Sequence, residues 1–300
     1  LIASRTWLRL RMCLRLSRIA NHLHPATCTS AKFDKAAPIR AAGGESSGPK
    51  NEAELRAELA AAYRIVAHLG WDDGIQNHLT VRIPGTTNEY LINSYGMGFE
   101  EITASSLVKI DHDGNVLEAG SFAGSVNVAG FNIHGAVHKA RPDAICVLHT
   151  HESNCAAVAS MKCGFLAGLS QHSLLCGEVP IHKYGPTTGP YAEHECASMT
   201  KDLGPLSRAL LLENHGVIVI GETIPEAMMR LWYVTKACEI QVRALSGILG
   251  VDGVNTVDNP GLRAGFAKGG IEFFKTIGPA EFAHHRRVVD RVNPGYNDLR

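Results

Sequence analysis

The stretch ICVLHTHE at residues 145–152 ends an apolar run in two histidines separated by one threonine. In a β-strand, residues two apart point to the same face, so His149 and His151 can reach one metal ion while Thr150 faces away. Imidazole nitrogen suits Zn²⁺, and catalytic zinc sites commonly use three protein ligands and leave one position open. The sequence therefore predicts two ligands of a metal site and requires a third from another strand end.

His215, in the run LLLENHGVIVIG, is the natural third ligand. It stands where one predicted strand stops, and Gly216 after it permits a sharp turn. Taken alone, the H-x-H pair favours a plainer interpretation, two hydrogen-bonded histidines of the core or surface. Other folds with this pair fit poorly. A cupin needs an almost wholly β chain, a metal-dependent hydrolase barrel carries the pair on an early strand, and the zincin pattern H-E-x-x-H is absent.

The elements that must position these histidines alternate between helices and short strands. Asn51 and Glu54 form a capping-box-like start for a first helix. Antiparallel hairpins among the strands predict one layered α/β domain, not a ladder of βαβ units. The further predicted elements are strands over 78–83, 89–93, 107–111, 115–120, 144–150, 209–214 and 216–221, a helix over 128–140, a long helix from Thr223 to Ser246, and two short helices within 258–300.

The formal net charge of zero is unevenly distributed. Residues 1–44 hold eight Lys or Arg and one acid, Asp34, which leaves 21 basic and 28 acidic residues and a net charge of −7 in the remainder. An acidic body argues against nucleic-acid binding, and no apolar run approaches the roughly 18 residues of a membrane span. The Arg-rich leader predicts a mitochondrial transit peptide, with a basic tail on a cytoplasmic protein as the alternative. Residues 45–52 then form a linker.

Seven motifs between residues 53 and about 250 together resemble the class II aldolases and their relatives, the adducin head domains. MKCG (161–164) and the last of the seven bring the chain nearest to adducin and its short adducin-like relatives. The motifs are NHLTVR (77–82), YLINSYGMGFEEIT (90–103), NVAGFNIHGAVHKARPD (127–143), VLHTH (147–151), GEVPIHKY (177–184), LLLENHG (210–216) and ACEIQVRAL (237–245).

This resemblance implies a three-layer α/β/α fold around a central mixed, largely antiparallel sheet. The sequence pattern after it predicts a helical extension over 251–300. It also implies a homotetramer with active sites near subunit interfaces. Zn²⁺, or another divalent transition metal, would be bound by His149, His151 and His215, which match the family's three metal-binding histidines.

The same resemblance shows where the chain departs from the enzymes. In the sugar-phosphate aldolases a glutamate nineteen residues before the first histidine of the pair carries the proton, and here that position is Gly130. Two serines that precede the glutamate are replaced by Val128 and Ala129, so a phosphorylated sugar is not expected. Backbone groups around Asn77 and Gly96, and the hydroxyl of Thr80, are the remaining candidates for binding a substrate.

His172, in LSQHSL between the second and third ligands, is the candidate replacement for the missing base. Three other groups are alternatives to it: Tyr184, Glu152, and Glu213, which could instead orient His215. His134 and His138 lie four residues apart on a predicted helix, and a hydrogen-bonded helix face is the favoured interpretation of that pair.

Two functions follow from these expectations. The first is a zinc-dependent carbon–carbon lyase, decarboxylase or epimerase that acts on a small unphosphorylated hydroxy-carbonyl compound or hydroxy acid. The second is a non-catalytic, adducin-like binding module associated with actin and the cytoskeleton. The intact set of three histidines favours the first, and the missing glutamate favours the second.

Overall fold

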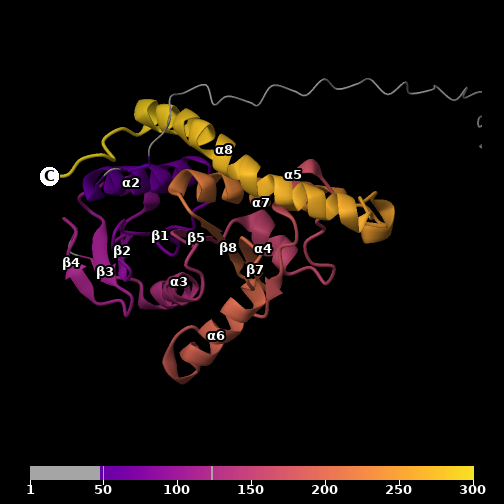
Figure 1. The fold of residues 1–300 in the computed structure, drawn as a ribbon, viewed down its shortest axis with the longest axis horizontal. Coiled ribbons are helices and arrows are strands. Elements are labelled where there is room, and N and C mark those ends of the chain that lie inside the picture. Colours follow the sequence, from indigo (N-terminus) through magenta and orange to yellow (C-terminus); the bar gives the residue numbers. More distant parts are fainter. Residues whose placement is uncertain (1–47, 50, 123) are drawn as a thin grey trace, which may run out of the picture. The chain divides into compact units, whose positions relative to one another are not determined.

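One sheet of eight strands organises the described part of the chain (Figure 1). The computed structural model describes residues 48–49, 51–122 and 124–300, so the predicted leader over 1–44 lies outside it. The strand order is β4-β3-β2-β1-β5-β8-β7-β6, and all neighbours pair antiparallel except β6 and β7. The strands are β1 (His78–Arg82), β2 (Glu89–Ile92), β3 (Val108–Asp111), β4 (Val116–Glu118), β5 (Cys146–Thr150), β6 (Ile181–His182), β7 (Ala209–Leu212) and β8 (Gly216–Gly221).

Helices cover both faces of the sheet. Along β5, Cys146 and Leu148 pack into a core with α2, α4, α7 and α8, whereas Val147 packs with α3 and α6 on the opposite face (Figure 1). This alternation confirms the predicted three-layer α/β/α fold. The helices are α2 (Glu52–His68), α3 (Val128–Ala140), α4 (Ser153–Ala159), α5 (Gln171–Cys176), α6 (Ala192–Leu203), α7 (Ile224–Ala244) and α8 (Pro260–Val292). None of these described helices is long and apolar enough to span a membrane.

The register of the central strands brings chemically active residues to one place. β1 pairs with β5 so that His78 stands opposite His149. β8 pairs with the other edge of β5 so that Ile218 stands opposite the same histidine. His149 therefore lies between two neighbouring strands, on the sheet face that α3 and α6 cover.

Most predicted elements are confirmed, with shifts of a few residues at their ends. The Asn51 side chain accepts a hydrogen bond from the Glu54 backbone N–H at 2.9 Å and begins α2. The two short helices predicted within 258–300 are wrong, because α8 is one helix of 33 residues that continues through Pro279. A proline inside a helix removes one backbone hydrogen bond. Buried Phe274 and Phe282, before and after it, keep both halves packed on the domain.

Replacement of Phe274 by alanine should loosen α8. The ring is fully buried against Met229 and Tyr233 of α7, and the Arg230 guanidinium lies 4.7 Å from its centroid. Loss of a buried phenylalanine costs about 3–5 kcal/mol, so chemical denaturation of Phe274→Ala should show a fall of that size in the free energy of unfolding. Phe266→Ala, on the exposed side of the same helix, is the matched control and should change it little. Equal losses in the two variants would contradict this account of how α8 docks.

Candidate metal centre

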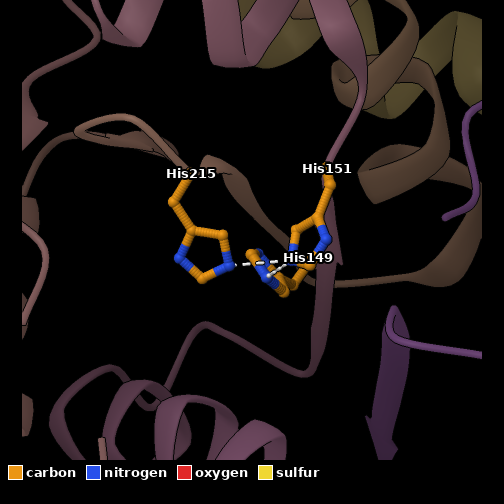
Figure 2. Close-up of side chains that lie close together, drawn as sticks. All are labelled: His149, His151 and His215. Carbon is orange, nitrogen blue, oxygen red and sulfur yellow. Dashed lines mark hydrogen bonds between the residues drawn. The ribbon is translucent and has the colours of Figure 1, made fainter. Parts of the chain in front are cut away.

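Three histidines converge on one point at the end of β5 (Figure 2). His149 is in β5, His151 follows that strand by one residue, and His215 comes from the turn between β7 and β8. The Nε2 atom of His151 lies 3.1 Å from Nε2 of His149 and 2.7 Å from Nε2 of His215. The structure therefore brings together the three histidines that the sequence predicts as metal ligands.

The turn between β7 and β8 places His215 beside the end of β5. Asn214 has a φ of 58°, a left-handed conformation that asparagine tolerates better than most residues. A Cβ atom added to Gly216 would lie 2.4 Å from the Thr150 carbonyl oxygen, so only glycine lets the two backbones approach so closely. A glycine at this position thus allows the third histidine to reach the first two.

Hydrogen bonds on the outer nitrogens orient two of the rings. His149 Nδ1 donates to the Val217 carbonyl oxygen at 3.0 Å, and His151 Nδ1 bonds to Asp73 Oδ2 at 2.9 Å. A proton on Nδ1 leaves the Nε2 lone pair free to bind a metal. Asp73, in the loop between α2 and β1, was not predicted, because its partner lies 78 residues away and no local motif marks it.

The third ring is held differently. His215 Nδ1 is buried without a hydrogen-bond partner among the described residues, and the Tyr184 ring packs against the imidazole at a centroid distance of 4.0 Å. Glu213, a candidate base with an orienting role for His215 as the alternative, is exposed, and no hydrogen bond joins its carboxylate to that nitrogen. Packing against Tyr184 accounts for the orientation of this ring.

Burial keeps two of these imidazoles, those of His149 and His215, neutral. Desolvation, and then the neighbouring imidazoles, hold the pKa of His149 well below its ordinary value, and desolvation with His151 lowers the pKa of His215 to about 4. Neutral imidazoles offer lone pairs at neutral pH. In a tetrahedral zinc site with ordinary bond lengths, ligand nitrogens lie about 3.3 Å apart, close to the spacings found here. The donor set fits a divalent transition-metal ion.

A chain of buried polar side chains begins next to this cluster. His78 stacks on His149 with ring centroids 5.0 Å apart, and its Nδ1 lies 2.8 Å from His134 Nε2. Thr80 Oγ1 lies 2.6 Å from His134 Nδ1 and 2.7 Å from His138 Nε2. We call His78, His134, Thr80 and His138 the histidine–threonine chain. The hydrogen-bonded helix face predicted for His134 and His138 is thereby confirmed.

The predicted substrate-binding residues have different surroundings. The Thr80 hydroxyl is fully buried between two histidines, which leaves it no hydrogen to donate to a substrate. Asn77 is 1% exposed, and both polar atoms of its amide lack a partner among the described residues. Gly96 is exposed in the loop after β2, with a φ of 106° and the Phe122 ring beside it.

The candidate bases are also placed. His172 lies on α5, where its ring packs against Tyr233 of α7 at a centroid distance of 4.9 Å and not against the three histidines. Glu152 is the N-cap of α4 and accepts a hydrogen bond from the Cys155 backbone N–H at 2.9 Å. Neither group is joined to the cluster by a described contact.

The sequence pattern of the class II aldolase and adducin N-terminal domain family matches residues 57–242. The chain belongs to this family. It is 40% identical over 256 residues to alpha-adducin of Rattus norvegicus. The aligned region is 82% of this chain but only 34% of that protein. It is also 40% identical to a Caulobacter vibrioides protein grouped with aldolase class 2, over 88% of this chain and 99% of the relative.

The fold is shared with solved structures of the same family. An L-fuculose 1-phosphate aldolase from Glaciozyma antarctica PI12 superposes with a TM-score of 0.68 and is 28% identical. The superposition covers 81% of this chain and 92% of the aldolase. The relatives therefore include both enzymes of this fold and the much longer adducins.

Burial of His138 should make the protein sensitive to acid. Desolvation, supported by the nearby Arg82 charge, lowers the pKa of this imidazole to about 3, although its bond to the Ala144 carbonyl acts in the opposite direction. Its partners are Thr80, the Tyr90 ring and that carbonyl. Because the unfolded chain takes up the proton near pH 6.5, the stabilisation is complete above that pH and is lost as the pH falls toward 3.

The expected loss from this one histidine is about 2 kcal/mol between pH 7.5 and pH 5. Denaturation of the metal-free protein across this range would measure it. In His138→Gln the free energy of unfolding should change less steeply with pH, because unfolding takes up about one proton fewer than in the native protein. An unchanged slope in that variant would show that His138 does not take up the proton.

Asp73 should tune the affinity for metal without being a ligand. Its carboxylate fixes the His151 ring, and loss of such an outer hydrogen bond typically weakens metal binding by about 10- to 100-fold. Competition with a chelator should show this loss in Asp73→Asn. Asp72→Asn, which changes the neighbouring carboxylate, is the matched control and should keep the native affinity. Equal affinities in all three proteins would exclude an orienting role for Asp73.

Proposed function

We propose that this protein is a zinc-dependent carbon–carbon lyase, decarboxylase or epimerase that acts on a small unphosphorylated hydroxy-carbonyl compound. The observation that carries the proposal is the convergence of three imidazoles, each of which offers a ring nitrogen within 4.8 Å of the other two. Zinc held by His149, His151 and His215 would supply Lewis acidity toward a carbonyl group. The shared fold with an L-fuculose 1-phosphate aldolase supports the same class of chemistry.

The residues around the centre support a substrate without phosphate. Val128 and Ala129 begin α3 and carry no hydroxyl that could bind an anion. The Asn77 amide, buried next to His78 without a partner, is a polar group that a substrate carbonyl or hydroxyl would satisfy. The homotetramer and the mitochondrial leader stay predictions from the sequence.

Removal of one ligand should abolish both metal binding and turnover. Purified protein is expected to carry one zinc per chain by elemental analysis, and His149→Ala should lose it, because two imidazoles bind a metal far more weakly than three. A screen of short hydroxyaldehydes, hydroxyketones and hydroxy acids would detect lyase or decarboxylase products. His172→Ala should keep its zinc, and its activity reports separately on the predicted base. Full activity in metal-stripped protein would overturn the proposal.

A second function has its own support in the 40% identity to alpha-adducin. A non-catalytic adducin-like module would bind actin filaments through its surface and would not depend on the three histidines. Co-sedimentation with filamentous actin at micromolar concentration separates the two functions. Pelleting that is unchanged in His149→Ala would favour the module, whereas absence of pelleting favours the enzyme.

A further inference from the structure

The histidine–threonine chain has a fixed direction. His138 Nδ1 lies 2.7 Å from the Ala144 carbonyl oxygen, which can only accept, so Nδ1 carries the proton and donates. Neutral His138 then has a lone pair on Nε2, and the Thr80 hydroxyl must donate to it. The hydroxyl oxygen in turn accepts from His134 Nδ1. Each bond thus sets the proton position of the next.

The last member of the chain is His78. With its proton on Nδ1, His134 leaves Nε2 as an acceptor, and His78 Nδ1 donates to it at 2.8 Å. His78 is therefore left with an unprotonated Nε2, because the hydrogen bond that its ring makes among the described residues uses Nδ1. Burial lowers the pKa of His78 to about 3, in agreement with a neutral ring.

The His78 ring lies beside His149 of the metal centre, and its Nε2 faces Gly130, which leaves room for it. His78 is the cross-strand neighbour of His149, and a Cβ atom added to Gly130 would lie 2.1 Å from His78 Nε2. The imidazole thus fills the space into which a side chain at position 130 would project. A glutamate introduced there alone would have to displace a ring that is buried and hydrogen-bonded to His134.

We propose that His78 Nε2 accepts the hydrogen bond of a substrate hydroxyl at the metal centre, and that this substrate is a small 2-hydroxy acid. His134, Thr80 and His138 are positioning residues that fix the tautomer of His78. The inference rests on the proposed metal-dependent function and deepens it by naming the group that contacts the hydroxyl.

The charges around the centre select an acid over a neutral sugar. His78 Nδ1 donates to His134 and His149 Nδ1 donates to the Val217 carbonyl oxygen, so each of these two rings is left with an uncharged, unprotonated Nε2 and adds no charge to the centre. The carboxylate that contacts the cluster, Asp73, bonds to the outer nitrogen of His151. A neutral acceptor at His78 does not repel an anionic substrate, whereas a carboxylate at the same place would.

The tautomer can be observed directly in zinc-loaded protein that contains ¹⁵N-histidine. Long-range ¹H–¹⁵N spectra should show His78 protonated on Nδ1 and bare on Nε2. Glycolate, the smallest 2-hydroxy acid, should shift the Nε2 resonance. Methoxyacetate keeps the oxygen and the carboxylate but has no hydroxyl hydrogen, so it should leave that resonance in place. A His78 protonated on Nε2, or equal shifts with the two acids, would overturn the proposal.

Two variants separate a contact from a structural role. In His78→Phe, zinc should still bind. The ratio of the affinities for glycolate and methoxyacetate should fall by about 10-fold, because one hydrogen bond to glycolate is lost. Thr80→Val keeps the shape but breaks the chain, so His78 should populate both tautomers while zinc affinity stays native. An unchanged preference in His78→Phe, or a single His78 tautomer in Thr80→Val, would contradict the assignment.

Failure of the proposed function has a different signature. Zinc and glycolate binding with the expected His78 shift, but no product with any substrate, would reject the lyase and retain the contact to the hydroxyl. Native protein that binds no zinc would reject both. Turnover that persists in His78→Phe with an unchanged KM would reject the role of His78 and retain the enzyme.

Discussion

The pairing of β1 with β5 is the constraint on which the rest of the site depends. Side chains alternate across a strand, so a shift of one residue in this register would move His78 away from His149 and to the other face of the sheet. The correct register is enforced by Leu79 and Leu148, which enter the apolar core on the opposite face. A hydrophobic pattern on one side of the sheet thus determines the polar chemistry on the other.

The site shows how burial can favour metal binding. A buried imidazole is costly to protonate, so histidines in the interior stay neutral and keep lone pairs that a cation can use. Mutual proximity adds to this effect, because a charge on any one ring would raise the cost of a charge on its neighbours. The environment that makes these histidines weak bases toward protons therefore leaves their lone pairs available to a metal ion.

Much of the fold and part of the site could be predicted from the sequence. The two-residue spacing of His149 and His151 indicates a strand, and Asn51 indicates the start of a helix. Both could be predicted because each depends only on residues close by in the chain. His78, Asp73 and the directed bonds of Thr80 escaped prediction, because their partners lie 54 to 78 residues away. The continuous α8 escaped for a related reason, since tertiary packing outweighs the local effect of Pro279.

The first acceptor in the histidine–threonine chain belongs to the main chain. Any residue type at position 144 that fits the buried site would present the same carbonyl oxygen to His138. The identity of Ala144 therefore carries none of the information that decides where the protons of three histidines reside. Evolution could vary the side chain there, within its small volume, and leave the proton order intact. The direction of these hydrogen bonds is therefore fixed by the position of a main-chain carbonyl group. A comparison of residue types among related sequences would not reveal it.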